Sequence, residues 1–414
     1  MKKSKILFLF GVTIGVFLIT VSNVNAWFTP NKTSFALSGV YSDGLNTSED
    51  ANNAHNAYSS MGLSYMKKIT SPTISAVKGS HSNGTAYLNS GIVFMSGHGN
   101  KDLMAFNKSG GTEFYIQANT TTVGNYIGIG NYVNASNALI VFAGCETAKG
   151  SSNISSYVVN KGAKISIGWT TSVNAGSHTN WLKRFNNKIK DKSTTVANAK
   201  RSADGYIYLD SRVKNGKIYG SSGYNPWYFM SGGSKSQTIS NISSKHEYIS
   251  NEYFVTKYNN NEILSKESNV LNIVENFIVE NIDSSFDKSD YILEVNGVDT
   301  KYYDYIMYVD GIRTNFGYSI AVDKDGTVRL YDNTNSKTSA SLKQNLTSNN
   351  TLSKKFKVYD FDQQVTDDYH NCKITPYMKT NYYDVTDEKL YQVAIYDIEF
   401  SNGILTSVEY KEEL

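Results

Sequence analysis

The sequence predicts an α/β domain with a mainly parallel sheet, followed by a C-terminal α+β domain. Three observations support this fold class. The chain has 414 residues, which is longer than one ordinary domain. Between residues 34 and about 206, strands made of apolar residues alternate with amphipathic helices. From about residue 263 onward, one helix precedes a series of strands that hairpin turns separate.

The α/β domain begins with a strand over residues 34–41, which the Asp43-Gly44 turn ends. A helix follows, because apolar residues recur at helical spacing at Ala51, Ala54, Ala57, Tyr58 and Met61. Gly62 is suited to end this helix. Further helices are expected over residues 154–159 and, after the last strand of the domain, over residues 181–189.

Three further strands of this domain are continuously apolar, at residues 91–96, 138–143 and 164–169. A strand with one solvated face alternates apolar and polar residues, so continuous apolar strands indicate a sheet covered on both faces. The helices that separate these strands along the chain indicate βαβ units and therefore mainly parallel strand pairing.

The C-terminal region combines one helix, over residues 270–278, with an antiparallel meander, which makes it α+β. Its strands are expected at residues 291–295, 305–309, 318–322, 328–331, 356–359, 391–400 and 404–410. Asp310-Gly311, Asp325-Gly326 and Asn402-Gly403 supply hairpin turns. A Gly/Ser-rich stretch over residues 231–245 marks the domain boundary. We therefore expect domains over residues 27–235 and 263–414, with a linker over residues 236–262.

The N-terminus has the pattern of a signal peptide. Three lysines within the first five residues precede an apolar stretch over residues 6–20, and Val24-Asn25-Ala26 fits a cleavage site of small residues. The apolar stretch is short for a membrane span, although a retained anchor is the alternative. We expect residues 1–26 to be removed and the protein to be secreted or extracellular, with the cell surface as a further location.

The charge balance gives no reason to expect a nucleic-acid partner. The formal net charge of the full chain is +3, and the three lysines of residues 1–26 account for all of it. A neutral mature protein without a stripe of Lys and Arg is not attracted to nucleic acid or to an anionic membrane surface. We expect neither partner once the signal peptide has been removed.

The only two cysteines are Cys145 and Cys372. An exported chain with two cysteines is not a disulfide scaffold, so they either form one bridge or include a functional thiol. The sequence around Cys145 favours the second reading. Apolar strands run into Ser96-Gly97-His98-Gly99 and into Ala143-Gly144-Cys145-Glu146. Ligands bind at the carboxyl ends of strands in parallel sheets, so His98 and Cys145 are expected to face one another there.

This pair of residues suits nucleophilic catalysis. A thiol with an ordinary pKa is mostly protonated at neutral pH, and a nearby imidazole can take its proton or protonate a leaving amine. The negative charge that develops on an attacked carbonyl needs N–H donors, for which the backbone amides of Gly99 and Cys145 are candidates. The glycines at 97, 99 and 144 allow backbone and substrate to approach closely.

The two motifs resemble those of the caspase-like (clan CD) cysteine peptidases, a superfamily that includes gingipains, clostripain and many bacterial relatives. The resemblance covers residues 32–205 and includes the Gly162-Ala163 strand that ends at Trp169. It implies a three-layer αβα sandwich, with His98 as general acid/base, Cys145 as nucleophile, and Gly99 and Cys145 as the oxyanion hole. Trp169 and Thr170 would line the substrate pocket. The Gln-Ala-Cys-x-Gly sequence of true caspases is absent, so specificity for Asp is not expected.

The leading hypothesis is therefore a secreted cysteine endopeptidase that acts on peptide or protein substrates with a Cys145–His98 dyad. No cofactor and no metal is expected. One alternative is a catalytically inactive secreted or surface binding protein that keeps the fold, and another is a structural Cys145–Cys372 disulfide. His178 is a further candidate, since the loop after the third buried strand could bring it to the site, although a surface position is the simpler expectation.

Overall fold

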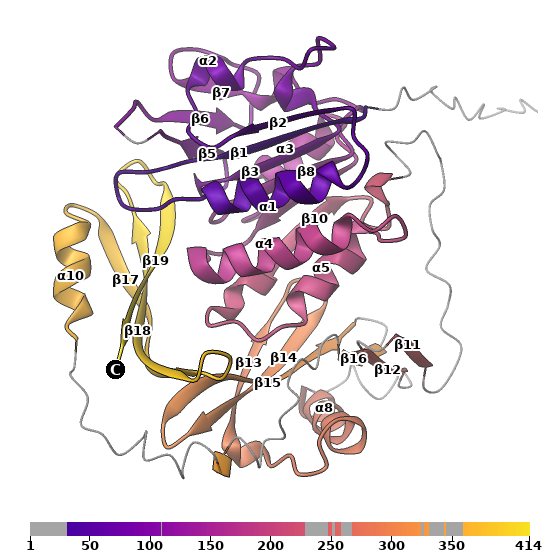
Figure 1. Cartoon of the computed structure of the whole chain (residues 1–414), viewed down its shortest axis with the longest axis vertical. Helices are drawn as coiled ribbons and strands as arrows, with labels where there is room; N and C mark the ends of the chain where they lie inside the picture. The colour runs from indigo at the N-terminus through magenta and orange to yellow at the C-terminus, as the bar shows by residue number, and fades with distance from the viewer. Residues whose placement is uncertain are drawn as a thin grey trace, which may run out of the picture.

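The computed structural model describes residues 31–108, 110–227, 247–250, 253–257, 267–323, 327–330, 343–344 and 359–414. The predicted signal peptide, the predicted boundary at residues 231–245 and residues 356–358 of a predicted strand lie outside these ranges. The described chain is a mixed α/β structure with two sheets (Figure 1). Within it, no helix has both the length and the apolar character needed to cross a membrane.

A six-stranded sheet forms the centre of the N-terminal domain, in the order β10-β9-β8-β3-β1-β2. Its strands are β1 (Thr33–Ser38), β2 (Tyr65–Ile69), β3 (Ile92–Ser96), β8 (Leu139–Ala143), β9 (Ile165–Trp169) and β10 (Gly216–Gly220). All neighbours are parallel except β9 and β10, which confirms the mainly parallel sheet. The edge strand β2 was not predicted, because most of its residues are exposed and it has no apolar pattern.

Both faces of this sheet are covered, as the apolar strands predicted. Ile92 and Phe94 of β3 face one core, whereas Val93 and Met95 face the other. The first core is closed by α1 (Ser48–Ser59), α4 (Ala175–Ile189) and α5 (Val196–Asp204) (Figure 1). The second is closed by α2 (Ile74–Val77), α3 (Ile154–Asn160) and a group of short strands.

The short strands begin directly after β3. They are β4 (His98–Gly99), β5 (Leu103–Phe106), β6 (Phe114–Gln117) and β7 (Tyr126–Gly128). The first three pair antiparallel in order, and β7 runs parallel to β6. Strands of two to four residues carry too little periodicity to be predicted. Their position matters, because β4 contains His98 and pairs with β5 on one side, which leaves its other side to a strand from elsewhere in the chain.

The C-terminal region contains helices and strands. Its elements are α8 (Glu267–Asn281), β13 (Tyr291–Asn296), β14 (Lys301–Val309), β15 (Ile312–Val322), β16 (Thr327–Leu330), α10 (Phe361–Asp368), β17 (Lys373–Asp384), β18 (Lys389–Glu399) and β19 (Leu405–Glu413). These strands pair antiparallel, except for β15 and β17, which pair parallel and so depart from the predicted meander. The helix α8 packs on β13–β16, and α10 packs on the long strands β17–β19. The sequence predicted neither β17 nor α10, whose patterns are mostly polar.

Part of the predicted linker is strand. β11 (Glu247–Ser250) and β12 (Tyr253–Lys257) pair with one another, and β12 also pairs antiparallel with β16. The β-branched and aromatic residues of 253–256 favour a pleated strand once an edge is available. The C-terminal sheet therefore begins before residue 263.

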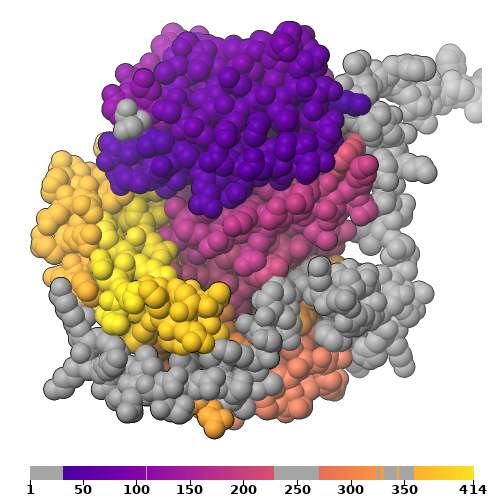
Figure 2. Space-filling view, viewed as in Figure 1, coloured from indigo at the N-terminus to yellow at the C-terminus, as the bar shows by residue number. Residues whose placement is uncertain are grey.

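The two domains share backbone pairing at one place. Leu405, the first residue of β19, pairs antiparallel with Gly99 of β4, which joins the C-terminal strands to β4–β7 in one sheet. In Figure 1 the hairpin of β18 and β19 rises to the level of β5, and Figure 2 shows these yellow strands lying against the N-terminal domain.

A second contact between the domains is charged and buried. The short helical turn η3 (Ser211–Asn215) carries Lys214, whose Nζ lies 2.6 Å from Asp304 Oδ1 of β14 and 2.8 Å from Ser319 Oγ of β15. The side chains of Lys214 and Asp304 are 0% and 1% exposed. Two opposite charges withdrawn from water are stable only together, so this pair ties the N-terminal domain to the C-terminal sheet.

We expect Lys214→Met to lower the free energy of unfolding by about 3–5 kcal/mol, because it leaves the Asp304 carboxylate buried without a cation. The double variant Lys214→Met/Asp304→Leu should recover most of this loss, since no isolated charge remains. Urea unfolding of the wild type, the single variant and the double variant measures both effects. A single variant within about 1 kcal/mol of the wild type would contradict a stabilising role for the pair.

Candidate active site

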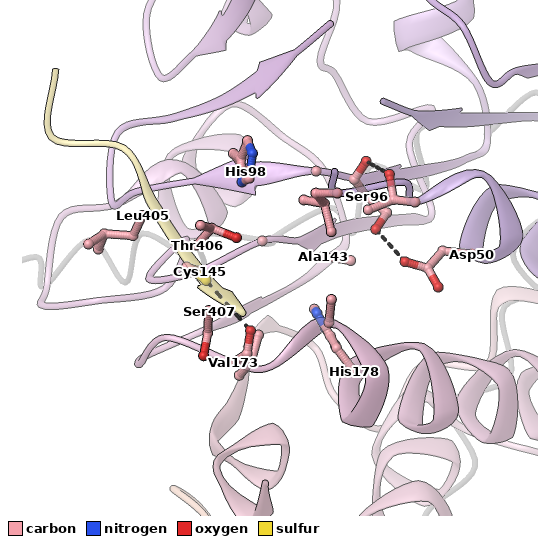
Figure 3. Close-up of a pocket in the computed structure, with 15 residues that line it drawn as sticks. Asp50, Ser96, His98, Ala143, Cys145, Val173, His178, Leu405, Thr406 and Ser407 are labelled. Atoms are coloured by element: carbon pink, nitrogen blue, oxygen red, sulfur yellow. Dashed lines mark hydrogen bonds between the residues drawn. The ribbon is translucent and has the colours of Figure 1, made fainter. Parts of the chain in front are cut away.

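His98 and Cys145 reach the same cavity because β3 and β8 are parallel neighbours in register. Ser96 at the end of β3 pairs with Ala143 at the end of β8. His98 and Cys145 each follow two residues later, so the two strands deliver them at the same level of the sheet. Both side chains line one cavity, with β19 crossing its mouth (Figure 3).

The imidazole of His98 is held between two partners. Its Nε2 lies 2.9 Å from Asp43 Oδ2, while its Nδ1 has no hydrogen-bond partner among the described residues. The ring packs against Tyr41 at 4.2 Å between centroids. Tyr41 itself is fixed, because its hydroxyl donates to the carbonyl of Ala105 and accepts from the His98 backbone N–H. The imidazole is thus oriented through Nε2, which leaves Nδ1 available.

Asp43 is a carboxylate in the folded protein. Burial by itself would raise the pKa of this carboxyl group, but the hydrogen bond and charge of His98, together with the Leu45 N–H, hold its pKa below the ordinary value. A carboxylate beside Nε2 stabilises the imidazolium form and fixes the ring orientation. The sequence predicts only that Asp43 ends a strand, because its contact with His98 joins residues 55 positions apart that no local pattern links.

Cys145 is a free, buried thiol. Its Sγ lies 3.8 Å from the carbonyl oxygen of Val173, and its side chain is enclosed at 5% exposure. Burial raises the pKa of the thiol to about 12, so it is protonated at neutral pH in this conformation. Cys372 is also free and is partly exposed, which contradicts the alternative of a Cys145–Cys372 disulfide.

The backbone around Cys145 is tight and strained. A Cβ atom at Gly144 would lie 2.9 Å from the carbonyl oxygen of Gly97 and 3.5 Å from the Gly99 nitrogen, so only glycine fits. The next residue after the thiol, Glu146, has a φ of 58°, which is rare for a residue with a side chain. The segment that carries Cys145 is therefore packed closely against the segment that carries Gly99.

The structure places the two predicted pocket residues at the end of β9, outside the lining of this cavity. Trp169 is fully buried in the core, where its indole N–H donates to the carbonyl of Val213. The Thr170 hydroxyl donates to the carbonyl of Asn215 at 3.2 Å. The Trp169 backbone is tied to the segment after Cys145, since its N–H donates to the Thr147 hydroxyl and its carbonyl accepts from the Ala148 N–H.

Two further titratable residues line the cavity. Asp50 accepts hydrogen bonds of 2.6 Å from the hydroxyls of Ser96 and Thr179, and burial raises its pKa to about 6. His178 lies in α4, not on a surface loop, and packs edge-on against Trp169. Its Nε2 is buried without a hydrogen-bond partner in the described chain, and burial lowers its pKa to about 3, so it is neutral. The helical spacing of Asp50 with Ala51 and Ala54 was the available signal for a buried Asp50.

The cavity is small and is closed by both domains. Its volume is about 30 Å³, which is too little for a peptide side chain. Leu405, Thr406 and Ser407 of β19 form part of its wall. In the described part of the chain, no three His, Cys, Asp or Glu side chains are grouped so that they could hold a metal ion.

Comparison with known proteins gives little further information. No protein-family model matches the chain, and no curated protein matches it. Among solved structures, the chain is similar to the Arg-specific cysteine proteinase gingipain R with 10% sequence identity and a TM-score of 0.33. The superposition covers 92% of this chain and 68% of that proteinase. A likeness at this level carries no argument about activity.

We expect iodoacetamide to alkylate Cys372 faster than Cys145 in the native protein. Cys372 is partly exposed, whereas Cys145 is buried with a thiol pKa near 12. Timed iodoacetamide labelling at pH 7.5 with peptide mass mapping measures both rates, and labelling in urea supplies the control in which the two rates converge. Faster labelling of Cys145 than of Cys372 in the native protein would contradict the burial of Cys145.

We expect Asp50→Asn to gain stability relative to the wild type as the pH rises. The folded protein binds a proton at Asp50 with a pKa near 6, against an ordinary value of 3.8. The contribution of this carboxyl group to the free energy of unfolding is therefore full below pH 3.8 and is lost as the pH rises through 6. The asparagine variant has no titrating group at this position, so it does not lose stability in this way. The difference in unfolding free energy between the two proteins should move by about 2–3 kcal/mol from pH 4 to pH 7.5.

Urea unfolding at several pH values measures this difference, and the exposed Asp191→Asn serves as the matched control. A difference for Asp50→Asn that does not change with pH would show that the carboxyl group titrates normally in the folded protein.

Proposed function

We propose that this protein is a secreted cysteine endopeptidase with a caspase-like N-terminal domain. The observation that carries the proposal is the position of His98 and Cys145 in one cavity, at the ends of two neighbouring parallel strands. A third residue orients the imidazole, because Asp43 lies 2.9 Å from Nε2 and leaves Nδ1 free. Nucleophile, base and orienting group are the constituents of a thiol acyl-transfer site.

In the proposed reaction, Nδ1 of His98 accepts the proton of the Cys145 thiol as the sulfur attacks the carbonyl carbon of a peptide bond. The S–C bond forms, and the amides of Gly99 and Cys145 donate to the oxygen that becomes negative. The C–N bond then breaks as His98 passes its proton to the leaving amine. Water hydrolyses the resulting thioester, which releases a carboxylic acid and restores the thiol.

The proposal extends to location and domain roles. Residues 1–26 act as a signal peptide and residues 27–235 as the peptidase domain, with peptides or proteins outside the cell as substrates. The signal-peptide pattern of the sequence supports this location. The catalytic step uses only side chains and backbone amides of the chain.

A second candidate function is a binding protein that has the fold without the activity. One observation favours it: the thiol is buried, protonated at neutral pH, and directed at the Val173 carbonyl instead of at His98. This candidate requires that Cys145→Ala leaves the biological activity of the protein unchanged. The peptidase proposal requires that the same variant loses all cleavage, so one variant separates the two functions.

We expect Cys145→Ala and His98→Ala to abolish hydrolysis of a diverse peptide library by the reduced protein. Asp43→Asn should lower kcat on the order of 10²-fold with little change in KM, because it removes the group that orients the imidazole and stabilises its protonated form. Matched controls are Cys372→Ser and the exposed Asp191→Asn, which should retain wild-type rates.

Liquid chromatography with mass spectrometry of the library products gives the rates and the cleavage sites. Cleavage that persists in Cys145→Ala would disprove the proposed nucleophile, and an unchanged kcat in Asp43→Asn would remove Asp43 from the mechanism.

A further inference from the structure

We propose that the end of the β18–β19 hairpin, residues 400–407, occupies the substrate cleft and keeps the peptidase latent. The segment lies where an extended substrate peptide would bind, and it must leave before a substrate enters. This inference rests on the proposed function, because it assigns the cavity of His98 and Cys145 as the place of catalysis.

The tip of the hairpin pairs with the backbone beside His98. Leu405 pairs with Gly99, and the side chain of Asn100 donates to the carbonyl of Gly403 at 3.2 Å. These contacts fall on the two residues that follow His98. An exposed strand edge beside a catalytic cavity accepts an extended peptide through backbone hydrogen bonds. Here the edge is already filled by residues of the same chain, over the amide that is a candidate for the oxyanion hole.

The C-terminal domain covers His98. Phe400 packs edge-on against the imidazole, with ring centroids 5.6 Å apart. Tyr369 packs against Phe400 at 6.2 Å, and its hydroxyl donates to the carbonyl oxygen of Asp43. His98 is 4% exposed, and its Nδ1 is buried. A leaving amine therefore reaches Nδ1 only after the cover has moved.

β19 forms part of the cavity wall. Figure 3 shows β19 passing over Cys145, with Leu405, Thr406 and Ser407 on the same side as the thiol. Thr406 and Ser407 are 3% and 2% exposed. Because these residues line the cavity together with Cys145, the segment contributes to the burial of the thiol.

Leu405 belongs to the walls of two cavities. It also lines a second, open cavity of about 460 Å³, whose walls include Asn100, Glu146 and Lys149. Of the residues that the structure describes, Leu405 is the one that lines both cavities. Its withdrawal would open the smaller cavity toward the larger one, which has room for peptide side chains. The walls of the second cavity carry both acidic and basic groups, in ion pairs such as Lys149–Glu146 and Lys373–Glu399.

The attachment of the hairpin suggests how it is released. Arg212 of η3 contacts both Asp397 carboxylate oxygens and donates to the Ser407 hydroxyl, which fixes the strands below the tip. The tip itself is held by the pairing of Leu405 with Gly99, by the hydrogen bond from Asn100 to the Gly403 carbonyl, and by a hydrogen bond between the side chains of Asn402 and Tyr115. Movement or proteolytic cleavage of the tip alone would open the cavity while the domains stay joined at Lys214 and Asp304.

The test uses the full mature chain with Cys372→Ser, so that only Cys145 reacts. We expect Phe400→Ala/Leu405→Ala to raise the rate of iodoacetamide labelling of Cys145 at least tenfold, and to raise the rate of library cleavage by a similar factor. Ile292→Ala, an exposed position on β13 of the same domain, is the control and should change neither rate. Equal labelling rates in the double variant and the parent would overturn the inference.

The two readouts separate this inference from the proposed function. Faster labelling without cleavage by either protein supports the occlusion of Cys145 and counts against the peptidase. Cleavage by the parent at the rate of the double variant supports the peptidase and overturns latency.

A second measurement covers the case in which the double variant does not fold. In the Cys372→Ser parent, a peptidyl thiol-reactive probe attached to Cys145 should displace the tip, so that hydrogen exchange over residues 400–407 becomes at least tenfold faster. Exchange over residues 291–296, which lie far from the probe, is the internal control. A probe adduct that leaves exchange over residues 400–407 unchanged would overturn the inference.

Discussion

The register between β3 and β8 is the constraint on which the candidate site depends. Ser96 pairs with Ala143, so the chain leaves both strands at one level and carries the imidazole and the thiol to one cavity. A slip of one residue would turn every side chain of one strand toward the opposite core. Phe94 and Phe142 fill opposite cores and are fully buried, so close packing excludes that slip. The geometry of the site is therefore a product of core packing.

The two buried carboxyl groups of the site differ in the partners that surround them. Asp43 remains ionised beside His98, whereas Asp50 has only neutral hydroxyl partners and a raised pKa. The left-handed conformation of Glu146 costs on the order of 1–3 kcal/mol and sits next to the thiol. The strained backbone at Glu146 and the buried Asp50 therefore lower the stability of the fold in this region. Such local costs are common at functional sites.

The C-terminal domain is attached to the N-terminal domain at places that differ in burial. The buried pair of Lys214 and Asp304 is costly to separate, because either charge alone would be isolated from water. Residues 400–407 pair with β4 at Leu405, and Phe400 and Leu405 of this segment cover the site. A domain that is firmly attached at one place can move a segment elsewhere and uncover a cavity without dissociating.

The sequence by itself determined the covered parallel sheet and the positions of His98 and Cys145 at strand ends, because continuous apolar runs and glycine turns are local patterns. Only the tertiary structure decided which groups surround them. Packing of α1 and α4 brings Asp50 and His178 to the cavity, the loop after β1 brings Asp43 to His98, and Trp169 lies in the core. The pairing of Leu405 with Gly99 joins residues that are about 300 positions apart. Such contacts arise when two folded surfaces meet, and no local pattern encodes them.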